Sequence, residues 1–171
     1  MTPTLSLGGG FYLKWQTDPD VMNSMQMNAI FPKSYVNNIN DFAKVMNTSS
    51  QEAGERFSEV RNTLSKMVKA GVKITPGTDS PFITYGLSLH TELQIFVDAG
   101  LTPHQALQSA TIRSAEAIGV EKDLGTIEAG KLADLVIVKG DPLKNIKDAW
   151  NVQVVIKNGV RYNIEDLLRK Q

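Results

Sequence analysis

The apolar residues along this chain follow two periods, one typical of helices and one typical of strands. The clearest helical period runs from Ser49 to Ala70, where apolar residues recur every three or four positions, and Pro32–Met46 shows a weaker form of it. Ser49 and Glu52 have the spacing of a capping box, and Gly71 stands where helices commonly end in a left-handed residue. The pattern therefore predicts two consecutive helices.

Strand-like stretches lie on both sides of these helices. Val72–Thr75 is a short β-branched run that opens directly into the polar loop Pro76–Ser80. Near the start of the chain, Thr4–Leu7 predicts a strand that a glycine triplet separates from a second apolar stretch, Phe11–Trp15. Asp18–Phe31 has no clear period, and we interpret it as a loop with room for a short helix.

Two further helices are predicted in the middle of the chain. The first covers about Ser88–Ala99 and ends before a glycine. The second begins with Thr102 as its cap, Pro103 at its first position and Gln105 completing a capping box, and it is expected to end near Gly119.

The last third of the chain predicts a small antiparallel β unit. Ala133–Lys139 and Val152–Lys157 are short apolar runs, and Asn158-Gly159 is the dipeptide most typical of a two-residue hairpin turn. That turn leads the chain back into Val160–Tyr162. Helices and strands alternate before this unit, so the pattern predicts an α/β protein.

Composition and charge exclude several classes of partner. The 18 basic residues balance the 18 acidic ones, which leaves no net field to attract nucleic acid, and no apolar run approaches the ~20 residues that span a bilayer. The absence of cysteine removes thiolate nucleophiles and thiolate metal ligands. The start of the chain lacks the features of a signal peptide, and the compartment is unknown, with the cytoplasm as the default expectation.

Asp79 is the leading candidate for chemistry. It stands in a polar loop just after a buried strand, which is where catalytic groups collect in parallel α/β folds. A carboxylate there can bind a divalent cation and can take a proton from an attacking water. The alternative is that the Asp79 side chain only caps the following turn.

The two histidines of the chain provide few further candidates. His90 lies near the start of a predicted helix, where a packed or solvent-facing role competes with ligand binding, and His104 is expected on an exposed helix. A catalytic zinc ion generally needs three protein ligands, and neither histidine belongs to an H-x-H or H-E-x-x-H pattern. Asp79 cannot form such a site alone.

Four segments resemble the amidohydrolase superfamily, specifically its imidazolonepropionase-like and prolidase-like members. They are Lys66–Ser80, which ends in Gly-Thr-Asp, then Leu89–Thr111, Gly125–Leu143 and Val154–Tyr162. The most specific match is GTIEAGKLADLVIVKGDPL, and the four occur in the order and spacing of the family over more than half of the chain.

The resemblance implies a fold. The family has a (β/α)₈ barrel with a small β-sandwich, so the fold expected here is α/β, a partial barrel made of its last strands and helices plus the C-terminal sandwich strands. Thr2–Leu5 would begin barrel strand seven and Asp79 would close strand eight. The barrel portion would occupy residues 1–122, and the sandwich strands with the tail would occupy residues 123–171. Since a whole barrel needs about 250 residues, we expect a sequence truncated from a longer one.

The resemblance also implies roles for residues. Asp79 would be both a metal ligand and the catalytic proton acceptor of a hydrolase acting on C–N bonds. Our mechanistic hypothesis for the complete enzyme adds His90, which would orient the substrate or support Asp79. The cofactor would be a divalent metal, Zn²⁺ by expectation, but the family's histidine ligands have no counterpart in this chain. We therefore expect weak or no metal binding and no turnover by the chain alone. The expected partners are a small amide or dipeptide substrate and either the missing barrel half or a second copy.

Two alternatives to the amidohydrolase interpretation follow from the same residues. The first is a catalytically silent structural or assembly fragment, motivated by the missing histidine ligands. The second is a prolidase-type metallopeptidase in the full-length protein, because that branch shares the same segments. Neither the substrate nor the oligomeric state can be predicted from the sequence.

Overall fold

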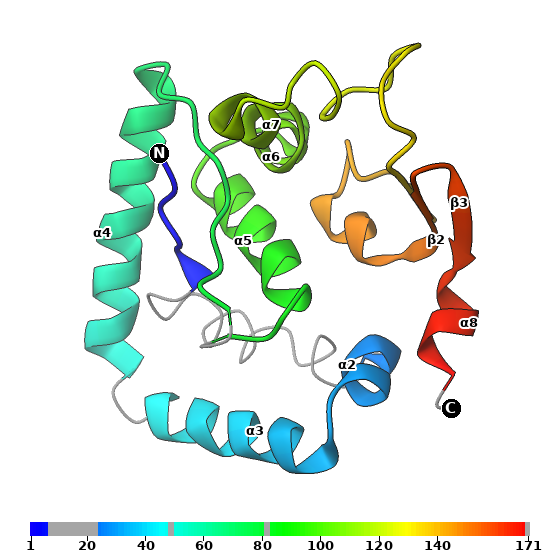
Figure 1. Ribbon diagram of the computed structural model, residues 1–171. Coiled ribbons are helices and arrows are strands. Elements are labelled where there is room, and N and C mark those ends of the chain that lie inside the picture. The colour runs from blue at the N-terminus through cyan, green and yellow to red at the C-terminus, as the bar shows by residue number, and fades with distance from the viewer. Residues whose placement is uncertain (7–23, 48–49, 81–82, 170–171) are drawn as a thin grey trace.

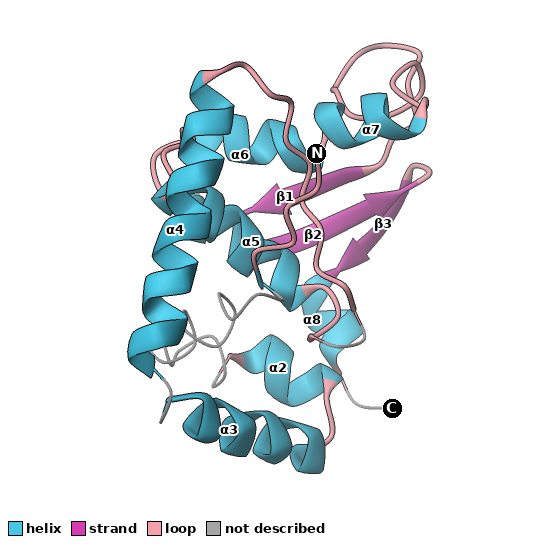
Figure 2. Ribbon diagram, turned by 90° about the vertical axis from the view of Figure 1, so that its left-hand side faces the viewer, coloured by secondary structure: helices cyan, strands magenta, loops and turns pink. Residues whose placement is uncertain are grey.

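A computed structural model describes residues 1–6, 24–47, 50–80 and 83–169, and it has the predicted α/β character (Figures 1 and 2). Helices and one antiparallel sheet make up the described part. In chain order the elements are α2 (Met25–Ile30), α3 (Lys33–Asn47), α4 (Ser50–Lys69), α5 (Leu87–Asp98), α6 (Pro103–Ala110), α7 (Ile112–Ile118), β1 (Leu135–Val138), the 3₁₀ helix η3 (Ile146–Trp150), β2 (Val152–Lys157), β3 (Val160–Asn163) and α8 (Ile164–Leu168).

The helices of the first half confirm the predictions closely. Helices α3 and α4 begin and end within one residue of the predicted ranges, and α2 is a short helix inside the segment interpreted as a loop. Gly71 has a φ of 80°, as expected for a residue that ends a helix. The capping box of Ser49 and the stretch Phe11–Trp15 lie outside the described residues.

Two extended segments, residues 1–3 and 72–75, run side by side between α4 and α5 (Figures 1 and 2). The N-terminal amino group of Met1 donates to the carbonyl of Lys73 at 3.0 Å, and the Thr75 N–H donates to the carbonyl of Met1 at 2.9 Å. In a pair of parallel strands, one residue bonds two residues of the neighbouring strand that are two positions apart, as Met1 does with Lys73 and Thr75. Neither segment is regular enough to count as a strand, although Val72–Thr75 was predicted as one.

The strand predicted at Thr4–Leu7 is wrong for its described residues. Thr4 has a φ of 50°, which lies in the left-handed region and ends the extended conformation. Leu5 follows in a turn, and its N–H group bonds a side chain rather than a neighbouring strand. Leu7 lies outside the described residues.

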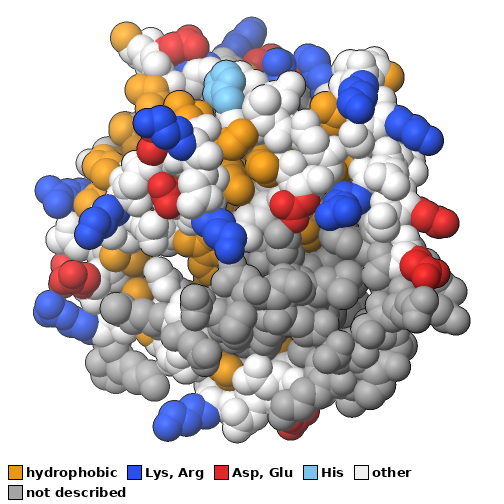
Figure 3. Space-filling model, turned by 180° about the vertical axis from the view of Figure 1, so that it is seen from behind, with side chains coloured by type: hydrophobic (Ala, Val, Ile, Leu, Met, Phe, Trp, Pro, Cys, Tyr) orange, Lys and Arg blue, Asp and Glu red, His pale blue; other side chains and the backbone are white. Residues whose placement is uncertain are grey.

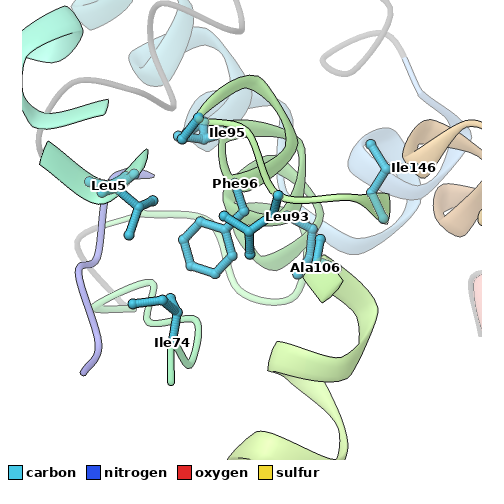
Figure 4. Packing of buried hydrophobic residues seen from close by; sticks show 10 residues of the cluster. Leu5, Ile74, Leu93, Ile95, Phe96, Ala106 and Ile146 are labelled. Carbon is cyan, nitrogen blue, oxygen red and sulfur yellow. The ribbon is translucent and has the colours of Figure 1, made fainter. Parts of the chain in front are cut away.

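The main hydrophobic core surrounds Phe96 of α5, which is fully buried (Figure 4). Leu5 and Ile74, which come from the two chain segments beside α5, lie next to the Phe96 ring, and Ile146 of η3 closes the core on another side. Leu64 brings α4 into the same cluster. Because the core draws on all of these segments, α5 is its central support.

The helix predicted from Thr102 to about Gly119 is two helices in the structure. Its start is confirmed, because Thr102 and Gln105 form the reciprocal capping box. At Thr111 the backbone leaves the helical region, with φ −121° and ψ −99°, and the Thr111 hydroxyl donates to the Leu107 carbonyl at 2.9 Å. Hydroxyl groups that compete for backbone carbonyls often mark such breaks. Helix α7 then ends at Gly119, as predicted.

The sheet has the order β1-β2-β3 with antiparallel pairing, which confirms the predicted β unit. Asn158 and Gly159 both have positive φ, 49° and 78°, as a type I′ hairpin requires. The Asp134 carboxylate accepts a hydrogen bond from the Asn158 N–H at 2.8 Å and one from the Lys157 ammonium, which holds the pKa of that carboxyl below its usual range.

The described surface is mixed in charge and partly apolar. On the face in Figure 3, acidic and basic side chains are interspersed and no region of one sign dominates. Val136, Ile137 and Val160 of the sheet are each at least half exposed. No described helix is both long and apolar enough to cross a membrane. The division of the chain at residue 122 stays a prediction.

Candidate functional site

The loop Pro76–Ser80 carries the first candidate residue. It follows the extended segment 72–75 directly, and the Asp79 side chain is exposed to solvent. Asp79 has a φ of 49°, and its neighbours Thr78 and Ser80 face each other through hydroxyl groups 3.4 Å apart. Among the described residues nothing bonds the Asp79 carboxylate, so it is available to a ligand. Residues 81–82, which a turn cap would use, are not described.

Gly77 fixes the backbone of this loop against the N-terminal segment. A Cβ atom at Gly77 would lie 2.4 Å from the Thr2 Cγ2 atom and 2.9 Å from the Thr4 Oγ1 atom. Both distances are inside van der Waals contact, so a larger residue at position 77 would force the Thr2 and Thr4 side chains to move. The close approach places the loop and the N-terminal segment together just before Asp79.

Glu92 of α5 lies beneath the same two segments. Its side chain is fully buried, and its carboxylate accepts hydrogen bonds from the N–H groups of Leu5 at 2.9 Å and Ser6 at 2.6 Å. A buried carboxylate is costly unless it is hydrogen-bonded, and these donors supply that compensation. Glu92 therefore joins helix α5 to the turn that ends the N-terminal segment.

Burial raises the pKa of the Glu92 carboxyl above its ordinary value, because a buried carboxylate loses its water. The backbone N–H groups of Leu5, Ser6 and Gly77 act in the opposite direction and lower the pKa. The direct hydrogen bonds to the carboxylate are those from Leu5 and Ser6.

His90, the second candidate, packs against Trp150 of η3. The centroids of the two rings are 4.9 Å apart and the ring planes are inclined by 34°. The Nδ1 atom of His90 and the Nε1 atom of Trp150 are both buried, and neither has a hydrogen-bond partner among the described residues. Burial lowers the pKa of His90 to about 4, so the ring is neutral at physiological pH.

The structure does not join the two candidate residues directly. His90 and Asp79 make no hydrogen bond to each other, and His104 is exposed on α6, as expected. In the described ranges no group of three or more His, Asp and Glu side chains is arranged to hold a metal ion. The described residues therefore do not form a metal site by themselves, and Asp79 and His90 stay predictions as site residues.

A hollow of about 200 Å³ is located away from these residues. It is lined by the beginning of the extended segment, at Val72 and Ile74, and by side chains of α4 and α6. Asp79 lies beyond the other end of that segment, so the hollow is not part of the candidate site. Its two cationic side chains, Lys73 and Arg113, are paired with Glu116 at 2.9 and 2.8 Å.

The sequence analysis named neither Glu92 nor Trp150 as a functional residue. The signal for Glu92 is a single acidic residue within the otherwise uncharged stretch Thr91–Val97 of a helix. A lone charge on a buried helix is rarely tolerated without partners. Those partners are 86 and 87 residues away in the chain, so the sequence could mark Glu92 but could not name them.

The model of the amidohydrolase family matches residues 12–161. Two related proteins are a 5-methylthioadenosine/S-adenosylhomocysteine deaminase from Thermodesulfovibrio yellowstonii and an imidazolonepropionase from Symbiobacterium thermophilum. The first is 34% identical over 127 residues, covering 68% of this chain and 28% of the relative. The second is 36% identical over 83 residues, covering 43% of this chain and 18% of the relative.

A solved structure similar to this chain is a Xaa-Pro dipeptidase with methionine bound in its active site. The two share 31% sequence identity and a TM-score of 0.63, over 95% of this chain and 34% of the dipeptidase. This chain thus spans about a third or less of the length of each of these three proteins.

Proposed function

We propose a function for this chain from the premise that it belongs to the amidohydrolase family, whose members hydrolyse C–N bonds and generally use divalent metals. In this proposal the chain is the C-terminal part of a metal-dependent amidohydrolase, with the last barrel strands and helices and the C-terminal sandwich strands. Asp79 is its catalytic carboxylate. The observation that carries the proposal is the position of Asp79, exposed in the loop after an extended segment that pairs in parallel with the N-terminal segment.

Asp79 has a defined role in this reaction. A divalent metal, Zn²⁺ by expectation, would supply an activated water when bound in the complete enzyme. The Asp79 carboxylate is proposed to help hold the ion, to accept the proton of the attacking water, and to return that proton to the leaving nitrogen. Its exposure and freedom from hydrogen bonds among the described residues support this role, because an already engaged carboxylate would be a poor base.

His90 is proposed to contact the substrate in the complete enzyme. Its lowered pKa makes it a neutral hydrogen-bonding group rather than a cation, and its Nδ1 atom has no partner within the described part of the chain. A neutral imidazole can accept or donate a hydrogen bond to an uncharged amide without adding charge. The packing against Trp150 would fix the plane of the ring.

The substrate is proposed to be a small molecule with an amide or related C–N bond. A prolidase-type activity on dipeptides is the second candidate, and the specific observation that favours it is the Xaa-Pro dipeptidase, which aligns with 95% of this chain. A catalytically silent assembly fragment is the candidate from another class, and the incomplete ligand set of the described residues favours it.

Two measurements test these proposals. The first is the metal content and hydrolytic activity of the purified 171-residue chain, for which we expect neither stoichiometric zinc nor turnover. The second uses the full-length enzyme that contains this chain, where Asp79→Asn should lower turnover of its substrate by about a hundredfold or more. Asp123→Asn, at another exposed aspartate, is the matched control and should leave turnover unchanged.

The outcomes separate the candidates. Unchanged turnover in the Asp79→Asn enzyme would refute the assignment of Asp79. A full-length protein that is inactive toward Xaa-Pro dipeptides and other small amides, with metal supplied, would favour the silent fragment. Activity on Xaa-Pro dipeptides alone would select the prolidase type.

A further inference from the structure

We propose that Glu92 is a positioning residue for Asp79: its buried carboxylate holds the turn after the N-terminal segment, and that segment packs against the loop Pro76–Ser80 from which Asp79 projects. The inference rests on the proposed function only in taking Asp79 as the catalytic carboxylate. The bonding arrangement itself is independent of that role.

The first argument is the set of donors around the carboxylate. Leu5 and Ser6 donate their N–H groups at 2.9 and 2.6 Å, and the segment that these residues follow packs against Gly77 of the loop through Thr2 and Thr4. Glu92 is fully buried, so water cannot take the place of these donors. Removing the carboxylate would leave the buried N–H groups of Leu5 and Ser6 unsatisfied, which is unfavourable for the present arrangement.

The second argument is backbone strain at two residues, one beside Leu5 and one near Gly77. Only three non-glycine residues in the described ranges have positive φ, and one of them, Asn158, belongs to the hairpin turn. The other two are Thr4, directly before Leu5, and Asp79, two residues after Gly77. Left-handed backbone at such residues persists only where the surroundings hold it, and it collects at functional sites. Glu92 bonds the two residues that follow Thr4, and the Thr4 side chain lies beside Gly77, two residues before Asp79.

The third argument is the rigidity of the helix that carries Glu92. Leu93, Ile95 and Phe96 of α5 are at most 4% exposed and belong to the main core. His90 precedes Glu92 by two residues, which is about 200° around a helix, so it packs on Trp150 from the opposite side. Helix α5 is therefore packed on both faces, so the Glu92 carboxylate is held in a fixed position beneath the two segments.

The test compares Glu92→Gln with a matched control in the 171-residue chain. Glutamine has the same shape but presents an amide NH₂ to N–H donors. The control is Glu116→Gln, because the Glu116 carboxylate bonds Lys73 at 2.9 Å, at the other end of the extended segment that leads to Asp79. Amide hydrogen exchange and backbone resonances are measured by NMR, alongside the thermal unfolding transition.

In Glu92→Gln we expect the amides of Leu5 and Ser6 to exchange about tenfold faster or more, because they lose bonds to a charged acceptor. The Asp79 resonances should shift as its loop is released. In Glu116→Gln these signals should stay as in the wild type. Exchange at Leu5 and Ser6 within about twofold of the wild type, or unmoved Asp79 resonances, would overturn the proposal.

A second variant keeps the proposal testable if Glu92→Gln does not fold. Glu92→Asp keeps the charge but shortens the side chain by one methylene, and the same two amides should again exchange faster. In the wild type, Leu5 and Ser6 should exchange at least about tenfold more slowly than the amide of the exposed Ile127 after correction for sequence. Equal exchange rates for these amides and the reference amide would show that Glu92 does not hold Leu5 and Ser6 in place.

Kinetics in the full-length enzyme separate this inference from the proposed function. If Glu92 positions Asp79, Glu92→Gln should lower kcat by about tenfold or more and leave KM within about twofold of the wild type. If its role is purely structural, the variant should contain less active enzyme, and the kcat and KM of the enzyme that stays folded should be those of the wild type. Faster exchange with unchanged kcat would refute positioning. Unchanged turnover in Asp79→Asn would instead refute the proposed function and leave the exchange result standing.

Discussion

The contact between His90 and Trp150 makes the stability of the protein depend on acid in a predictable way. Burial lowers the pKa of His90 from 6.5 to about 4, so the native state binds the proton more weakly than the unfolded state does. A group with a lowered pKa in the native state contributes stability at high pH that is lost on acidification. For these two values the loss is about 1 kcal/mol at about pH 5.5 and about 3 kcal/mol at about pH 4.

The variant that tests this is His90→Phe, which keeps an aromatic ring against Trp150 and cannot take up a proton. It also removes a buried Nδ1 atom that has no partner within the described residues, so its stability near neutral pH should equal or exceed that of the wild type. The free energy of unfolding in urea is measured for both proteins between about pH 4 and about pH 7.5. The stability of the variant relative to the wild type should increase steadily as the pH falls.

A subtraction makes the comparison specific. Burial raises the pKa of Glu92, so its contribution to stability declines as the pH rises above about 4.5, opposite in sign to that of His90. Subtracting the wild-type curve from the variant curve removes this contribution, because the two side chains lie on opposite faces of α5. A flat difference for His90→Phe would refute the inference that a neutral, desolvated ring is buried here.

Two further predictions concern packing around the site. Gly77→Ala should destabilise the protein by about 1–3 kcal/mol, because its Cβ atom would overlap Thr2, and Thr2→Ala should recover part of that loss in a double-mutant cycle. Full stability of Gly77→Ala would mean that the two segments are not pressed together. Phe96→Ala should cost about 3–5 kcal/mol by urea unfolding, since the ring is fully buried at the centre of the main core. A cost below about 1 kcal/mol would show that the core is not built around this ring.

Local patterns predicted the elements whose cause is local. The period of α4 and the capping box of α6 lie within a few residues of chain, and both appear where expected. The hairpin at Asn158-Gly159 needs only two residues with positive φ, so its dipeptide was sufficient. For the same reason the α/β class and the antiparallel unit could be predicted without a structure.

Predictions failed where distant residues decide the local conformation. Thr4–Leu7 has the composition of a strand, but the N–H group of Leu5 bonds Glu92, which is 87 residues away, and the chain turns there instead. The break at Thr111 depends on hydroxyl groups that bond backbone carbonyls, which a hydrophobic period does not register. The position of Asp79 at the end of an extended segment could be predicted, whereas the carboxylate beneath it could not.

The chain contains the residues that position Asp79, but its described residues do not supply everything that the chemistry proposed for Asp79 needs. Every described partner of Glu92 belongs to the chain itself, as do the Thr2 and Thr4 contacts that fix Gly77. By contrast, no three potential metal ligands come together in the described residues, and the chain spans only 34% of the Xaa-Pro dipeptidase and 28% of the deaminase. It follows that the geometry of the Asp79 loop can be tested on the 171-residue chain, whereas the proposed turnover is to be tested in a full-length enzyme. A properly held Asp79 loop in an inactive chain is therefore the result that the two proposals jointly require.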